Sequence, residues 1–171
     1  PLLTPSKITA WLDCAHFLTL RHEVDSGARE PAPNLFGDVA RMLLQKALDH
    51  EQEVLERYRA AGRDVFMVPE REEREPFARW VTRVGDVLQA EHEIVFQMPF
   101  VHEGIRGIAD FLERVVADDG TVTYEPVDAK LARDAAKPGH VLQLCFYAEA
   151  IAAQTGRWPE HLHIALGSGR R

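Results

Sequence analysis

Two aspartates and a lysine in neighbouring apolar segments are the residues of this sequence whose types and spacing best suit chemistry. Asp110 interrupts the apolar segment 107–112. Asp128 and Lys130 lie two residues apart in the segment 125–131, so they point the same way if that segment is a strand. A carboxylate in an apolar strand is costly to bury unless it is paired or binds a cation. Two converging carboxylates beside a lysine would therefore form a site for a hard divalent cation, suited to phosphoryl transfer.

A turn and a helix would bring further polar groups to these residues. The Asp-Asp-Gly segment 118–120 is a turn signal, and it would fold the two apolar segments into an antiparallel pair that brings Asp110 close to Asp128. Gln143 and Tyr147 are four residues apart, so they share one face of the helix expected to follow. Gln143 could donate to a phosphate, and Tyr147 could bind a phosphate or stack on a base.

Three short motifs, taken in order, resemble those of the RecB-like nucleases in the PD-(D/E)XK superfamily. They are G-x-x-D at residues 107–110, D-x-K at 128–130 and Q-x-x-x-Y at 143–147. The opening segment 3–14 also resembles the start of such domains, so the likeness reaches across most of the chain. The resemblance implies an α/β fold with a restriction-endonuclease-like core, in which helices flank a central mixed sheet.

The resemblance also implies a Mg²⁺ or Mn²⁺ site. Its ligands would be the side chains of Asp110 and Asp128 and the backbone carbonyl of Ala129. Many relatives add a metal-binding histidine from an early helix, and His50 is the best match here, although its context departs from the usual glycine-preceded pattern. The acidic residues around His50 equally fit a solvated side chain, so both interpretations stay open.

The same resemblance assigns roles to the remaining polar residues. Lys130 would polarise the scissile phosphate or help to generate the attacking hydroxide, while Gln143 and Tyr147 would orient the substrate and Lys130. The expected activity is hydrolysis of DNA phosphodiester bonds, with single strands or DNA ends as substrates. The main alternative is a catalytically inactive nucleic-acid-binding module that assists a helicase or CRISPR partner. A third is a structural domain whose carboxylates only form ion pairs, Asp110 with Arg106 or Arg114.

Two cysteines bear on redox chemistry. With only Cys14 and Cys145, no disulfide framework is expected, and a reducing cytoplasm is the simplest location. Some RecB-like relatives bind an iron–sulfur cluster through one early and three late cysteines. Cys14 matches the early position, but a cluster would need further cysteine ligands beyond Arg171. Cys145 is more simply a small core residue.

The composition suits one domain spanning residues 1–171 with a single sizeable core, since 46% of the 171 residues are hydrophobic. No apolar run of about eighteen residues is present, so no membrane partner is expected. The formal net charge of −7 is unusual for a DNA-binding protein, but only five of the 27 acidic residues follow residue 124, where six Lys and Arg lie. The missing first Met and the abrupt end at Arg171 suggest a trimmed piece of a longer protein.

These residues need a sheet and flanking helices to position them, and hydrophobic periodicity predicts both. Helices are expected at residues 5–20, 34–62, 76–88 and 140–154, with a loop at 26–33. Strands are expected at residues 64–68, 94–101, 104–116, 121–131 and 161–166. This order of helices, strands, and then a helix and a strand indicates a central sheet covered by helices.

Two of the expected elements have clear inner faces. The second helix, capped by Asn34, would turn one stripe inward, namely Val39, Leu43, Ala47 and Val54. In the strand 121–131, alternation puts one set of side chains into a core opposite Asp128, namely Val127, Ala129 and Leu131. Glu125 lies on that same side and is therefore left outside the site. His161 and His163 share one strand face, where they suit a sheet edge better than a metal site.

Overall fold

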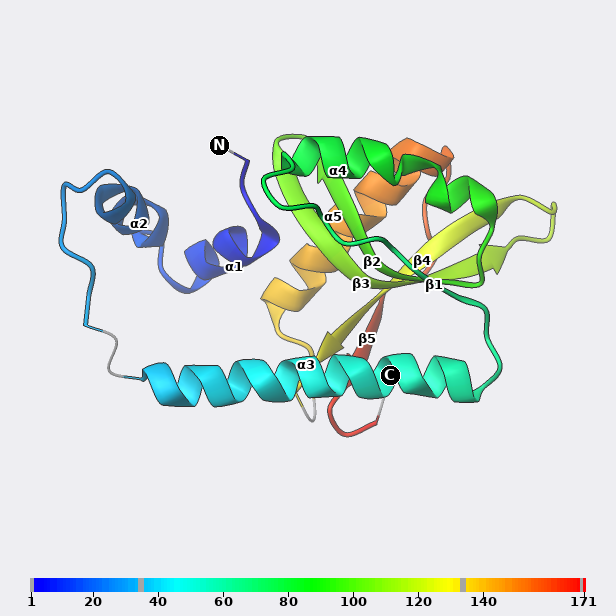
Figure 1. Cartoon of the computed structure of the whole chain (residues 1–171), viewed down its shortest axis with the longest axis horizontal. Helices are drawn as coiled ribbons and strands as arrows, with labels where there is room; N and C mark the ends of the chain where they lie inside the picture. Colours follow the sequence, from blue (N-terminus) through cyan, green and yellow to red (C-terminus); the bar gives the residue numbers. More distant parts are fainter. Residues whose placement is uncertain (1, 34–35, 133–134, 170) are drawn as a thin grey trace.

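Five strands form one sheet in the computed structural model of the chain, which describes residues 2–33, 36–132, 135–169 and 171. The strands follow their chain order across the sheet: β1 Val65–Met67, β2 Ile94–His102, β3 Ile105–Val116, β4 Val122–Lys130 and β5 His163–Leu166. The helices are α1 Pro5–Asp13, α2 Phe17–Asp25, α3 Gly37–Ala60, α4 Phe77–Arg83, the 3₁₀ helix η1 Gly85–Ala90, and α5 Pro138–Thr155. Helix α3 lies on one face of the sheet, and α4 and α5 lie on the other (Figure 1).

The sheet is mixed. Strands β2, β3 and β4 form an antiparallel meander, while β1 is parallel to β2 and β5 is parallel to β4. The expected turn at 118–120 joins β3 to β4. Helix α5 carries the chain from β4 back to β5, as a parallel neighbour requires. The expected α/β class, with a central mixed sheet flanked by helices, is confirmed.

Apolar side chains fill the space on each face of the sheet. Under α3, Val54 and Leu55 pack against the inward residues of the strands, which include Ile94, Phe111 and Val127. A larger core lies on the other face beneath α4, η1 and α5, and its members include Trp80, Val84, Leu88, Leu112, Tyr124, Leu144 and Ile151. Because helices cover both faces, a polar side chain in the middle of β3 or β4 is shielded from water.

The first predicted helix is wrong in one respect, because it consists of two helices. Thr4 caps α1 as expected, since its side chain accepts a hydrogen bond from the backbone of Lys7, with proline at the start of the helix. The helix ends at Asp13, where Cys14 adopts an extended conformation with φ −151° and ψ 109°. One extended residue interrupts the hydrogen-bond ladder without disturbing the apolar period, so periodicity alone does not reveal the break.

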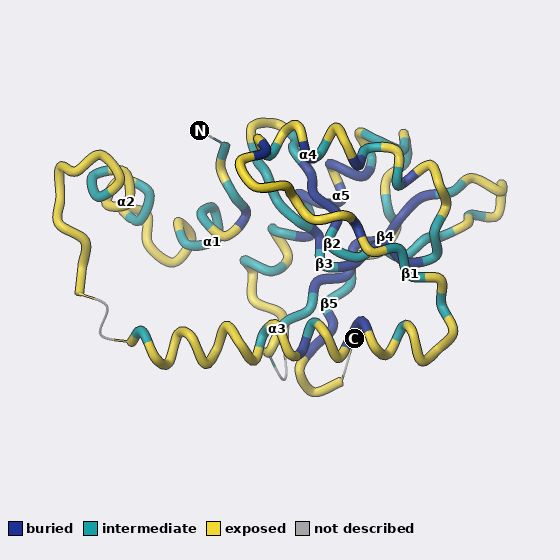
Figure 2. The backbone as a smooth tube through the Cα atoms, viewed as in Figure 1, coloured by how far each residue is buried: buried dark blue, intermediate teal, exposed yellow. Residues whose placement is uncertain are grey.

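Helix α3 has the expected length, but half of its predicted inner stripe is exposed. Val54 is buried, whereas Val39 and Leu43 are 49% and 51% exposed. The first turns of α3 extend beyond the sheet, so nothing in the described structure covers them (Figures 1 and 2). Asn34, the expected cap, lies outside the described residues, and Phe36 occupies the N-cap position of the helix.

The remaining predicted elements are present with small differences. The helix expected at 76–88 is α4 followed by η1, and the change to the tighter 3₁₀ form keeps Trp80, Val84 and Leu88 buried against the sheet. The loop, the strands and the last helix lie where periodicity places them, and Gly156 ends α5 in the left-handed conformation with φ 74°. No helix among the described residues is long and apolar enough to cross a bilayer.

Candidate active site

Asp110 and Asp128 face each other where β3 and β4 part. The pairing of these strands runs from Val116 and Val122 to Phe111 and Val127, and it ends there. In place of the next backbone hydrogen bond, Oδ2 of Asp110 accepts one from the backbone N–H of Ala129 at 2.8 Å. The carboxylate therefore fills the opening between the two strands, and the expected approach of Asp110 to Asp128 is confirmed.

Asp128 is held by two donors but keeps one oxygen free of hydrogen bonds. The side chain is 1% exposed, and Nζ of Lys130 lies 2.8 Å from each of its oxygens. The direction of approach makes a hydrogen bond to Oδ1 only, and Nε2 of Gln143 donates to the same oxygen at 3.2 Å. Oδ2 of Asp128 has no hydrogen-bond partner among the described residues. This oxygen has a charge contact with Lys130 but accepts no hydrogen bond, which leaves its lone pairs able to bind a metal ion.

Burial makes both aspartates weaker acids than they are in water. Desolvation, followed by the charge of Asp128, raises the pKa of Asp110 well above its usual value. Desolvation also raises the pKa of Asp128, even though the neighbouring Lys130 acts to lower it. Two like charges this close do not ionise together easily. The pair therefore binds a proton more readily than two separate aspartates do, and a metal ion would compete with that proton.

Gly107 and Tyr147, from the first and third sequence motifs, are in direct contact. A Cβ atom at Gly107 would lie 3.0 Å from a ring carbon of Tyr147, closer than side chains normally pack. The Tyr147 hydroxyl donates to the backbone carbonyl of Ile108 at 2.6 Å and accepts from Gln143 at 3.3 Å. These contacts fasten α5 to β3 two residues before Asp110, so the hydroxyl of Tyr147 positions the strand.

Glu51 joins the site from α3, and sequence reasoning missed it. Its carboxylate accepts a hydrogen bond from Gln97 of β2, which lies beside Asp110 in the sheet register. Gln97 has φ 61°, a conformation that non-glycine residues rarely adopt within a strand. Burial, and then the charge of Asp110, raises the pKa of Glu51 to about 7. One signal was available, because Glu51 lies four residues before Leu55 and so shares its inward face of the helix.

His50, the proposed fourth metal ligand, faces β5. It is 5% exposed, so the interpretation as a solvated residue is wrong. Its Nε2 lies 2.9 Å from the carbonyl oxygen of Ala165, and its Nδ1 lies 3.9 Å from Glu53. These described contacts join α3 to β5 and do not include Asp110 or Asp128.

Ion pairing to arginine does not account for the half-buried Asp110. Arg114 pairs with Glu91 at 2.7 Å, and the guanidinium of Arg106 lies over the ring of Phe77, 5.3 Å from its centroid. Among the described residues, neither arginine forms a salt bridge with Asp110.

The core-facing side of β4 is partly as expected. Val127 is buried under α3, and Ala129 packs partly against the same cluster. Leu131 lies just past the end of β4 and is 37% exposed, so the prediction that it faces the core is wrong. Side chains alternate between the two faces only within the strand, and β4 ends at Lys130. The alternation therefore gives no reason to expect Leu131 to be buried.

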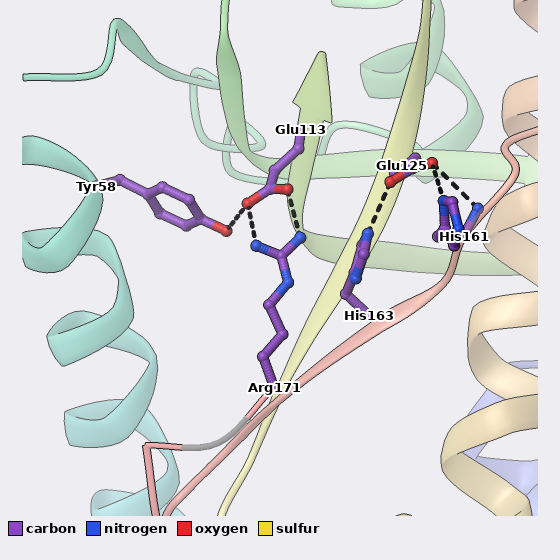
Figure 3. A network of polar contacts seen from close by, with 6 residues as sticks. All are labelled: Tyr58, Glu113, Glu125, His161, His163 and Arg171. Carbon is purple, nitrogen blue, oxygen red and sulfur yellow. Dashed lines mark hydrogen bonds and ion pairs between the residues drawn. The ribbon is translucent and has the colours of Figure 1, made fainter. Parts of the chain in front are cut away.

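A second carboxylate cluster lies on the face of β3 and β4 toward α3, and its charges are satisfied internally. Its members are Tyr58, Glu113, Glu125, His161, His163 and Arg171 (Figure 3). Glu113 and Glu125 are direct neighbours across the strands. Glu125 binds both histidines, at 3.0 Å and 2.7 Å, and Glu113 binds the tyrosine and the arginine. The cluster ties the chain after α5 to the sheet, which agrees with leaving Glu125 out of the site.

The residues around Asp110 suit a magnesium-like ion, although they are few. Among the described residues, no three His, Cys, Asp or Glu side chains converge to hold a metal ion. Mg²⁺, however, commonly uses only one or two protein carboxylates, with water and substrate phosphate completing its shell. The two neighbouring carboxylates, with the Asp128 oxygen that accepts no hydrogen bond among the described residues, fit that donor set. Cys14 and Cys145 are both free thiols, and two cysteines do not supply the four thiolates of a four-cysteine iron–sulfur cluster.

Comparison with protein-family models, with curated proteins and with solved structures gives no match to this chain.

Proposed function

We propose that this chain is a metal-dependent nuclease domain of the RecB-like type, with a restriction-endonuclease-like core, that hydrolyses DNA phosphodiester bonds in single strands or at ends. One observation carries the proposal. The half-buried Asp110 and the fully buried Asp128 lie side by side, and Oδ2 of Asp128 accepts no hydrogen bond among the described residues although Nζ of Lys130 lies 2.8 Å from it. A structural ion pair between Asp128 and Lys130 has no need of a second carboxylate beside it, whereas a divalent cation is bound more tightly by two.

The position of each side chain suits a different role in the reaction. Asp110, Asp128 and the carbonyl of Ala129 would hold Mg²⁺ or Mn²⁺, which when bound supplies charge neutralisation and a more acidic water. Lys130 is a quarter exposed at its side chain, so its ammonium can reach a phosphate while it remains beside Asp128. There it stabilises the negative charge that develops on the phosphate oxygens. Gln143 keeps the carboxylate of Asp128 aligned.

A second candidate function is a nucleic-acid-binding module without catalysis that assists a helicase or CRISPR partner. The exposed apolar residues at the start of α3 favour a protein that works against a partner, since such surfaces are uncommon on monomers. These include Phe36, Met42, Leu44 and Leu48. Cleavage separates the two candidates, because both would bind DNA.

The test is cleavage of end-labelled single- and double-stranded DNA with Mg²⁺, Mn²⁺ or EDTA. Asp110→Asn and Lys130→Ala are expected to abolish metal-dependent cutting while the circular dichroism spectrum stays unchanged. Asp49→Asn is the matched control, because Asp49 is an exposed acid of α3 whose loss should leave cutting intact. Full activity in Asp110→Asn would overturn the proposal. DNA binding without cutting would favour the second candidate.

A further inference from the structure

A cavity of about 500 Å³ is linked to the aspartate pair through Gln143, although neither aspartate lines it. It lies between the start of α1, the segment before α4, strand β3 and helix α5, and its polar lining includes Ser6, Arg71, Arg106, Gln143 and Tyr147. Gln143 connects the cavity to the aspartate pair, because it lines the cavity and donates a hydrogen bond to Asp128. A group bound in the cavity would therefore lie next to whatever the aspartates act on.

The cavity has the charge of an anion site. Arg71 and Arg106 both line it, and neither forms a salt bridge with a carboxylate among the described residues. The Arg106 guanidinium is held over the ring of Phe77, 5.3 Å from its centroid, which restricts its position. Two arginines without acidic partners are notable in a protein of net charge −7. Guanidinium groups recognise phosphate in particular, because their donors match its oxygens.

The other walls suit a nucleotide better than a free inorganic ion. Phe77 and Trp80 provide an apolar side, and Thr4 and Ser6 provide hydroxyl groups at the first turn of α1. Cavities of several hundred Å³ that are mostly apolar with a few polar groups are typical of small-molecule sites. A phosphate alone would leave most of this space unfilled.

We propose that this cavity binds one nucleotide of the DNA strand next to the cleaved bond, with its phosphate against Arg71 and Arg106. The proposal rests on the proposed nuclease function and adds to it the place where the substrate strand is held. It assigns a binding role to two residues outside the three sequence motifs.

Binding is measured without cleavage, by fluorescence anisotropy of a labelled single-stranded oligonucleotide in EDTA over a range of salt concentrations. Arg106→Gln and Arg71→Gln should each weaken binding several-fold and lower the slope of log affinity against log salt by about 0.7. Arg57→Gln is the matched control, since it removes the same charge from an exposed site on α3. It should leave both quantities unchanged.

Three forms of the DNA distinguish a terminal phosphate from an internal one. Linear strands with and without a 5′-phosphate and a circular strand are compared in the wild-type and Arg106→Gln proteins. If the cavity takes a terminal phosphate, removing that phosphate should weaken wild-type binding as much as Arg106→Gln does. If it takes an internal phosphate, the circular strand should bind as well as the linear one and should be equally sensitive to Arg106→Gln. Either result supports the cavity as the site.

Equal affinity and equal salt slope in the wild type, Arg106→Gln and Arg71→Gln would overturn the proposal. If that wild type still cleaves DNA, the nuclease function stands and only the cavity assignment fails. A wild type that neither binds nor cleaves DNA would overturn both. Thermal unfolding of each variant verifies folding, and Arg71, which is exposed, provides a readout that does not disturb the packing of Arg106 on Phe77.

Discussion

At the scale of single residues, a proton and a metal cation would compete for the same carboxylate oxygens. Asp110, Asp128 and Glu51 all have a pKa above the usual value, and burial is the largest cause in each case. A fold that only needed stability would replace such groups with apolar or neutral ones, because buried carboxylates cost free energy. Shifted acids that cluster in one place are typical of functional sites, although structural networks shift pKa values too.

The raised pKa values predict how the metal-free protein responds to pH. A carboxyl whose pKa is higher in the folded state contributes stability at low pH and loses it as the pH rises through the folded pKa. The stability of the wild type should therefore fall between pH 4.5 and about 7, the range set by Glu51. Asp110→Asn removes one of the acids with a raised pKa, so its stability should fall less steeply. Thermal unfolding in EDTA over this range measures both slopes, and parallel curves would contradict the prediction.

At the scale of elements, α5 and β3 are joined by the contact of Gly107 with Tyr147. Glycine is needed there because the tyrosine ring occupies the space of a side chain. The Tyr147 hydroxyl then bonds to the backbone of Ile108, so the helix determines the course of the strand that carries Asp110. Two of the three sequence motifs thus form one packing unit.

Tyr147→Phe should lower the free energy of unfolding by about 1 kcal/mol, because it leaves a buried carbonyl without its donor. Gly107→Ala should cost roughly 1–3 kcal/mol by overpacking against the rings. Since the two residues touch, the double variant should differ from the sum of the single changes. Denaturation in urea measures all three proteins, and strict additivity would show that the contact carries no coupling.

Helix α3 is covered by the sheet at one end and exposed at the other. Substitutions of two leucines, one in each part, test this difference. Leu55 is 1% exposed under the sheet, whereas Leu44 is 61% exposed beyond it. Leu55→Ala should cost roughly 2–5 kcal/mol through the lost contacts and the cavity left behind. Leu44→Ala should stay within about 0.5 kcal/mol, as expected at an uncovered surface. Equal losses in urea denaturation would mean that the first turns of α3 are covered in solution.

At the scale of the whole molecule, a strand pair and a helix from an earlier part of the chain bring three acidic residues to one place. Asp110 comes from β3, Asp128 from β4 and Glu51 from α3, and these three elements share the core between α3 and the sheet. A metal ion bound by Asp110 and Asp128 would be linked to the stability of the fold, because the unfolded chain cannot present the two carboxylates together.

Mg²⁺ or Mn²⁺ should therefore raise the unfolding temperature, and at roughly 100 times its Kd the ion should add about 3 kcal/mol to the free energy of unfolding. The rise should be larger above pH 7 than below it, because the ion then competes with fewer protons. Asp128→Asn should lose most of the effect, and Asp49→Asn should keep it. Calorimetry with and without the ion measures the difference, and an equal response in Asp128→Asn would place the ion elsewhere.

Much of this architecture follows from local pattern. The period of two along β3 and β4, the turn between them and the two-residue spacing of Asp128 and Lys130 together predict the strand pair and the convergence of its polar residues. The period of 3.6 in the last helix predicts that Gln143 and Tyr147 act together. These features depend on backbone geometry, which neighbouring residues determine.

Burial and long-range contact were decided only in three dimensions. The exposure of Val39, the entry of Glu51 into the site and the direction of His50 toward β5 all depend on where α3 crosses the sheet. An amphipathic period shows that a helix has an inner face, but it does not show how far the partner surface extends beneath it. The sequence alone thus determined the elements and the pairing of the aspartates. Only the tertiary structure decided which other side chains reach them, because distant segments meet through packing.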